Sequence, residues 1–132
     1  MSNRVLVVDD EPSIRHLLRS VLLDEQLQVE TAGTTIEALS KLEKGPFDVA
    51  IVDLLLPGVS GLELAEAIRL LDPGTAVILI TAYGSPSFEA IASHPAITHY
   101  IHKPFALERL LELIHRCLSG SAQTPSAPPA KS

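Results

Sequence analysis

Short runs of consecutive apolar residues constrain the fold of this chain most strongly. They occupy residues 5–8, 49–52 and 76–80, with a shorter run at 100–101. Strands that are apolar on both faces are typical of parallel sheets covered by helices on each side. A weaker candidate strand at 27–31 alternates apolar and polar residues, which is typical of a sheet edge. The runs therefore predict a mostly buried parallel sheet.

Helical patterns lie between and after these runs. Apolar residues recur at helical spacing over 14–22, 38–42, 64–71 and 107–118, and more weakly over 86–93. Pro12 suits a first helical turn, and the pairs Thr34 with Glu37 and Ser60 with Glu63 match the capping-box pattern. The order strand–helix thus repeats five times. It predicts a three-layer α/β sandwich with helices on both faces of the sheet.

Composition limits the classes of protein that this chain can belong to. Its 132 residues, 46% of them hydrophobic, suffice for one domain with a real core. We expect a folded domain over 1–118 and a flexible Ser/Ala/Pro-rich tail or linker over 119–132.

Composition also bears on location and partners. No apolar run approaches the roughly 18 residues of a membrane span, and no signal-peptide pattern is present. The single cysteine, Cys117, fits a reducing compartment, so a cytoplasmic location is expected. The net charge of -6 argues against direct nucleic-acid binding.

Charged and polar residues gather where the expected strands end. Asp9 and Asp10 follow the first strand, Asp53 the third, Thr81 the fourth and Lys103 the fifth. The carboxyl ends of parallel strands share one edge of the sheet, where ligands bind. Carboxylates about 4 Å apart repel by roughly 4 kcal/mol per pair at an effective dielectric of 20. A hard divalent cation such as Mg²⁺ can offset this repulsion, which one lysine cannot do fully.

This combination of groups suits phosphoryl transfer. A carboxylate can attack phosphorus and form an acyl phosphate, and the reaction depends mainly on positioning and charge neutralisation. Mg²⁺ on Asp10 and Asp53 would contact one phosphoryl oxygen. Lys103 would neutralise a second oxygen, and the Thr81 hydroxyl would hydrogen-bond a third.

At these residues the sequence resembles the receiver domains of two-component response regulators. The matching segments are VLVVDDE at 5–11, VDLLLPG at 52–58, GLE at 61–63, ITAY at 80–83, Tyr100, and KPF at 103–105. The resemblance implies a flavodoxin-like fold with five parallel strands in the order 2-1-3-4-5. It implies that Asp53 accepts a phosphoryl group from the phosphohistidine of a sensor histidine kinase or a histidine phosphotransfer protein.

The resemblance further implies a metal site and a switch. Mg²⁺ would be held by Asp10, Asp53, the backbone carbonyl of Leu55 and, through water, Asp9. The peptide bond between Lys103 and Pro104 would be cis.

On phosphorylation Thr81 and Tyr100 would move, and the surface formed by 86–93, 100–101 and 107–118 would change. Such a protein is mainly a regulatory phosphoacceptor that catalyses only its own phosphorylation and slow dephosphorylation. Whether phosphorylation produces a homodimer stays open.

Two other functions compete with this interpretation. Haloacid-dehalogenase-like phosphatases also use a strand-end Asp, Mg²⁺, a Thr and a Lys, but they carry a second acid two residues after the nucleophile, where this chain has Leu55. A flavin or nucleotide binder of the same fold needs a phosphate-binding loop of free backbone N–H groups after the first strand. The acids at 9–11 would repel a phosphate there.

Overall fold

Strands and helices alternate through residues 3–82, as the sequence predicts, and a further strand and helix follow within 93–119. The computed structural model describes residues 3–82 and 93–119. Its strands are β1 (Arg4–Val8), β2 (Gln28–Ala32), β3 (Val49–Asp53), β4 (Ala76–Ala82) and β5 (His99–Lys103). Its helices are α1 (Pro12–Asp24), α2 (Thr35–Glu43), α3 (Gly61–Leu71) and α5 (Leu107–Leu118). The helix expected at 86–93 lies outside the described residues except for Ser93, and so does the tail beyond Ser119.

The five strands form one parallel sheet in the order β2-β1-β3-β4-β5, which confirms the expected topology. The alternating strand β2 lies at an edge, with Gln28 and Glu30 exposed and Ala32 buried. Because the strand order reverses at β1, the carboxyl ends of β1 and β3 flank the position where such sheets bind ligands.

Three polar residues expected just after the strands belong to the strands themselves. Asp53 pairs with Ile80 across β3 and β4, and Thr81 and Ala82 pair with His102 and Lys103 across β4 and β5. The apolar pattern misses them because ladder hydrogen bonds use backbone groups and tolerate a polar side chain at the strand end. The sequence prediction of the carboxyl ends of these strands was therefore wrong by one or two residues.

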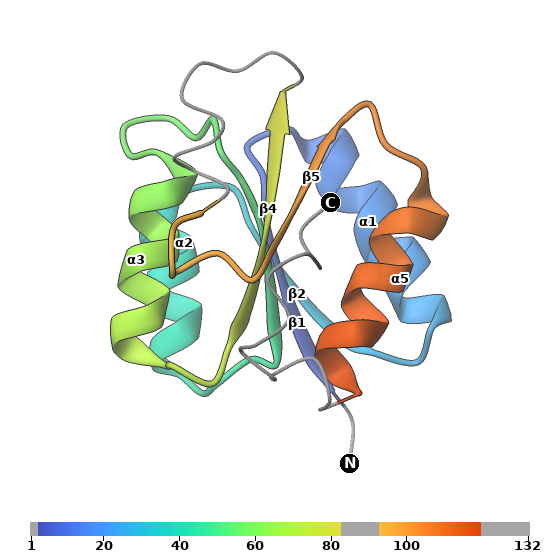
Figure 1. Ribbon diagram of the computed structural model, residues 1–132, viewed down its shortest axis with the longest axis horizontal. Coiled ribbons are helices and arrows are strands. Elements are labelled where there is room, and N and C mark those ends of the chain that lie inside the picture. Colours follow the sequence, from blue (N-terminus) through green and yellow to red (C-terminus); the bar gives the residue numbers. More distant parts are fainter. Residues whose placement is uncertain (1–2, 83–92, 120–132) are drawn as a thin grey trace.

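Alternate residues of the strands form two separate cores. Residues such as Val7, Ile51 and Ile80 pack with α1 and α5 on one face of the sheet. Residues such as Val52 and Leu79 pack with α2 and α3 on the other face. Figure 1 shows the two helix pairs on opposite sides of the sheet. Within residues 3–82 and 93–119, no helix is both long and apolar enough to cross a bilayer.

The two predicted capping boxes form differently. At α3 both halves are present: Ser60 Oγ accepts from the Glu63 N–H at 3.2 Å, and Glu63 Oε1 accepts from the Ser60 N–H at 3.1 Å. At α2 the Thr34 hydroxyl accepts from the Glu37 N–H at 3.1 Å, but the Glu37 carboxylate accepts from Gly33 instead of Thr34. Both carboxylates still satisfy a free donor at a helix start.

The start of α3 lies in direct contact with the end of β3. The N–H of Gly61 donates to the carbonyl of Leu54 at 2.7 Å. A Cβ atom added at Gly61 would lie 2.2 Å from the Asp53 carbonyl oxygen and 2.8 Å from the Leu54 Cα. Only glycine leaves room for this approach, so Gly61 brings the helix start against the backbone of Asp53.

Substitution of Gly61→Ala is therefore expected to lower the free energy of unfolding by about 1–3 kcal/mol, because the backbone must shift to accept the methyl group. Urea denaturation measures this change. Gly74→Ala is the matched control, since its Cβ would meet Asp72 Oδ1 at an ordinary 3.6 Å. Equal effects of the two substitutions would show that the contact at Gly61 is not tight.

Candidate functional site

Three carboxylates meet at the carboxyl edge of the sheet. Asp9 and Asp10 follow β1, and Asp53 ends β3. One oxygen from each of these side chains lies within 4.8 Å of the others. Asp9 is 1% exposed and Asp53 is 6% exposed, whereas Asp10 is open to solvent. The structure thus brings together the acids that the sequence selected.

Backbone contacts hold Asp9 in place. Its N–H donates to the Ala32 carbonyl of the edge strand at 3.1 Å, and its Oδ1 accepts from the Glu11 N–H at 2.9 Å. Arg15 Nη1 donates to its carbonyl at 2.6 Å. Its second oxygen, Oδ2, is buried and accepts no hydrogen bond from the described residues. A buried carboxylate oxygen without a donor favours a cation as its partner.

Asp53 is held from two sides. Its Oδ1 accepts from the Leu55 N–H at 3.0 Å, and its Oδ2 accepts from Lys103 Nζ at 3.0 Å. The same ammonium group lies 3.9 Å from Asp9 Oδ2. Lys103 ends β5, and the peptide bond that follows it, to Pro104, is cis as expected.

Burial and charge shift the proton affinities of two groups in the cluster. The pKa of Asp9 is raised from 3.8 to about 6: burial is the largest cause and the Asp53 charge adds to it, while the Glu11 N–H and Lys103 act in the opposite direction. For Lys103, burial lowers the pKa, but the hydrogen bond and charge of Asp53 outweigh it, so the net shift is upward. One cation therefore does not fully compensate the carboxylates.

This donor set fits a hard divalent cation. Carboxylate oxygens are the ligands that such ions prefer. Asp9 Oδ2 accepts no hydrogen bond from the described residues, and the solvent-facing Asp10 leaves an approach for an ion. The N–H of Leu55 bonds Asp53, which places Leu55 beside the cluster. Its role as a carbonyl ligand stays a prediction.

Thr81 and Tyr100 face the other side of the sheet. Thr81 lies two residues beyond Leu79, and Tyr100 packs against the same core, which faces α2 and α3. The Thr81 hydroxyl is hydrogen-bonded to His102 Nδ1 at 3.0 Å. No sequence pattern marks His102 as a neighbour of Thr81; the signal for it is strand register, since the two residues pair across β4 and β5.

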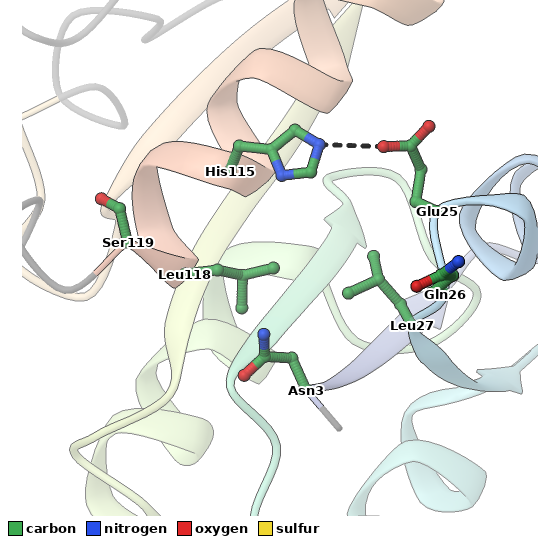
Figure 2. Close-up of a pocket in the computed structure, with 7 residues that line it drawn as sticks. All are labelled: Asn3, Glu25, Gln26, Leu27, His115, Leu118 and Ser119. Atoms are coloured by element: carbon green, nitrogen blue, oxygen red, sulfur yellow. Dashed lines mark hydrogen bonds and ion pairs between the residues drawn. The ribbon is translucent and has the colours of Figure 1, made fainter. Parts of the chain in front are cut away.

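A pocket at the opposite edge of the sheet does not share this chemistry. It is lined by Asn3, Glu25, Gln26, Leu27, His115, Leu118 and Ser119. Within it, His115 Nε2 lies at hydrogen-bond distance, 3.0 Å, from Glu25 Oε1 (Figure 2). Asn3 precedes β1, so the pocket lies at the amino edge, away from Asp53. The carboxylate cluster is the stronger candidate.

Comparison with known sequences identifies a family for this chain. A family model described as the response regulator receiver domain matches residues 5–115. The chain is 39% identical over 115 residues to the response regulator protein PilR of Pseudomonas aeruginosa, covering 87% of this chain and 26% of that protein. It is 30% identical to sporulation initiation phosphotransferase F of Bacillus subtilis, covering 89% of this chain and 95% of that protein.

A third relative, the transcriptional regulatory protein TrcR of Mycobacterium tuberculosis, is 35% identical over 90% of this chain and 46% of its own length. The chain thus spans 26% of PilR and 46% of TrcR, but nearly all of phosphotransferase F. The match is to one domain that occurs both alone and within longer proteins.

Solved structures agree with the sequence relatives. The CheY-like receiver domain protein of Methanospirillum hungatei JF-1 superposes with a TM-score of 0.85 at 34% identity, covering 91% of this chain and 96% of that one. The response regulator TrrA of Thermotoga maritima, in complex with Mg²⁺ and BeF, superposes with a TM-score of 0.77 at 37% identity, covering 87% and 98%.

The raised pKa of Asp9 predicts a pH-dependent stability in the absence of metal. The folded protein binds this proton more tightly than the unfolded chain, so its free energy of unfolding should fall as the pH rises from about 4 to 6. The decrease attributable to Asp9 is at most about 3 kcal/mol. Asp9→Asn carries no charge and should be more stable than wild type at pH 7.

Urea denaturation of both proteins with a chelator between pH 4 and 8 measures the difference. Subtracting the two curves removes the contribution of the other titrating groups. If the Asp9→Asn protein were no more stable than wild type at pH 7, the charge of the buried Asp9 would not be destabilising, and the prediction would be wrong.

Proposed function

Because this chain belongs to the receiver domains of response regulators, we propose that it is a signalling switch that accepts a phosphoryl group on Asp53. The observation that carries the proposal is the position of Asp53. It is held at the sheet edge by Lys103 at 3.0 Å, inside a cluster of three carboxylates. A nucleophilic carboxylate with an adjacent fixed cation is suited to attack on phosphorus.

The transfer forms one bond and breaks one. A carboxylate oxygen of Asp53 attacks the phosphorus of a phosphohistidine, the P–N bond breaks, and the imidazole nitrogen leaves with the electron pair and takes up a proton. The product is an acyl phosphate on Asp53. Lys103 remains paired to the developing negative charge, and the Leu55 N–H keeps the carboxylate in one orientation.

Mg²⁺ is the proposed cofactor of this reaction. Asp10 and Asp53, together with the Leu55 carbonyl and with Asp9 acting through water, would hold it. When bound, the ion supplies charge neutralisation for the carboxylates and the phosphoryl oxygens. The similarity to TrrA, whose structure was solved in complex with Mg²⁺ and BeF, supports a magnesium-dependent site in this chain as well.

The proposed phosphoryl donor is a sensor histidine kinase or a histidine phosphotransfer protein. The likeness to phosphotransferase F over nearly its whole length supports a receiver that acts in a relay. The phosphatase alternative loses support, because the matched family is the receiver domain and Leu55 offers no acid two residues after Asp53.

The proposed domain boundaries are supported by the same observations. The family match ends at residue 115 and α5 ends at Leu118, which supports a receiver domain over 1–118. Residues 119–132 are proposed to form a Ser/Ala/Pro-rich tail or linker.

Phosphorylation is proposed to move Thr81 and Tyr100. An acyl phosphate adds nearly two negative charges and new acceptor oxygens, which can draw the Thr81 hydroxyl toward the site. Tyr100 packs against the core on the α2 and α3 face, and Thr81 projects on the same face of the sheet. Their movement is proposed to change the surface formed by 86–93, 100–101 and 107–118.

A small-molecule phosphodonor with Mg²⁺ should add one phosphoryl group to the protein, and Asp53→Asn should abolish the mass gain. Asp24→Asn, which removes an exposed acid at the end of α1, should label like wild type. Intact-mass spectrometry measures the product. Labelling of Asp53→Asn at the wild-type level would disprove Asp53 as the acceptor.

Mg²⁺ should raise the melting temperature of the wild-type protein, because a ligand that binds only the folded state stabilises it. Asp10→Asn should remove most of that increase and should change the metal-free melting temperature little, since Asp10 is exposed. Asp24→Asn again serves as the control. A full Mg²⁺ effect in Asp10→Asn would exclude Asp10 as a ligand.

A further inference from the structure

His102 lies directly beside Thr81. The two residues are register partners in the parallel ladder of β4 and β5, so their side chains project on the same face of the sheet. Thr81 is 1% exposed, and its hydroxyl oxygen lies 3.0 Å from His102 Nδ1. The bond therefore joins two side chains held by neighbouring strands rather than by a loop.

The hydrogen bond competes with the proposed task of Thr81. A hydroxyl carries one proton, and a phosphoryl oxygen on Asp53 would need that proton as a donor. When Nδ1 accepts, the Thr81 proton points at His102. When Nδ1 donates, the Thr81 oxygen is still tied to the imidazole. The competition for the hydroxyl proton therefore holds in the tautomer in which Nδ1 accepts. In the other tautomer that proton is free, and the hydrogen bond opposes only a movement of the Thr81 side chain away from His102.

Tyr100 lies against the imidazole. The Tyr100 and His102 rings lie 5.7 Å apart, centroid to centroid, at an angle of 76°, which is an edge-to-face contact. Tyr100 stands two residues before His102 and so projects on the same face of β5. His102 therefore contacts both residues that are proposed to move.

We propose that His102 is a positioning residue of the switch, which holds Thr81 in its unphosphorylated position through the Nδ1 hydrogen bond and so opposes phosphorylation of Asp53. The proposal rests on the function proposed above. In it, His102 favours one of two positions of Thr81 and does not itself contact the phosphoryl group.

Beryllofluoride with Mg²⁺, a phosphoryl mimic, provides the test. His102→Leu removes the partner of Thr81 and should tighten beryllofluoride binding about fivefold, the equilibrium equivalent of one ordinary hydrogen bond. His102→Asn keeps a polar atom near the position of Nδ1 and should bind within about twofold of wild type. His102→Val, which suits a strand, replaces the Leu variant if circular dichroism shows that the latter is unfolded.

A second background separates positioning from general packing. In Thr81→Val the hydrogen bond is already absent, so adding His102→Leu should leave the dissociation constant unchanged. The proposal would be overturned if His102→Leu tightened beryllofluoride binding equally in the wild-type and Thr81→Val backgrounds. It would also be overturned if His102→Leu did not tighten binding in the wild-type background. The proposed function itself would fail if the wild-type protein bound no beryllofluoride, or if the Asp53→Asn variant bound it as tightly as wild type.

Discussion

The ion pair between Lys103 and Asp53 is the interaction on which the rest of the site depends. It joins the ends of β3 and β5, which are separated by β4 in the sheet, and its N–O distance is 3.0 Å. Without this cation, the carboxylates of Asp9 and Asp53 would be confined together below the surface with only backbone donors. Lys103 offsets part of the repulsion between the two carboxylates but compensates the charge of Asp9 only partly, as the raised pKa of Asp9 shows.

The alternation of side chains along the strands places the charged residues and the residues proposed to move on opposite faces of the sheet. Asp53 and Lys103 stand two residues beyond Ile51 and Ile101, which face α1 and α5, whereas Thr81 follows Leu79 toward α2 and α3. The acceptor and its cation therefore belong to one face, and the residues proposed to move belong to the other. A signal generated at Asp53 has to pass around the end of β4, where Thr81 is one residue beyond the register partner of Asp53.

Much of this arrangement follows from the sequence, and the exceptions have physical causes. Apolar runs and helical spacing predict the layers, and strand ends predict that Asp9, Asp53 and Lys103 meet. The bond between Thr81 and His102 could not be read in the same way, because it depends on the register of β4 against β5. Apolar pattern sets which face a residue occupies but leaves open which residue of the next strand lies beside it.

The site works against the stability of the domain that carries it. The buried Asp9, which shares Lys103 with Asp53, favours protonation or a bound cation, as its raised pKa shows. The two apolar cores on either face of the sheet offset the cost of this charge. Because the bare site is the less favourable state, a ligand that adds positive charge gains free energy from relieving it. A phosphoryl group then restores negative charge at the same edge. With Thr81 held by His102 before phosphorylation, the two proposed positions of Thr81 differ in free energy by about one hydrogen bond. Phosphorylation can reverse a difference of that size.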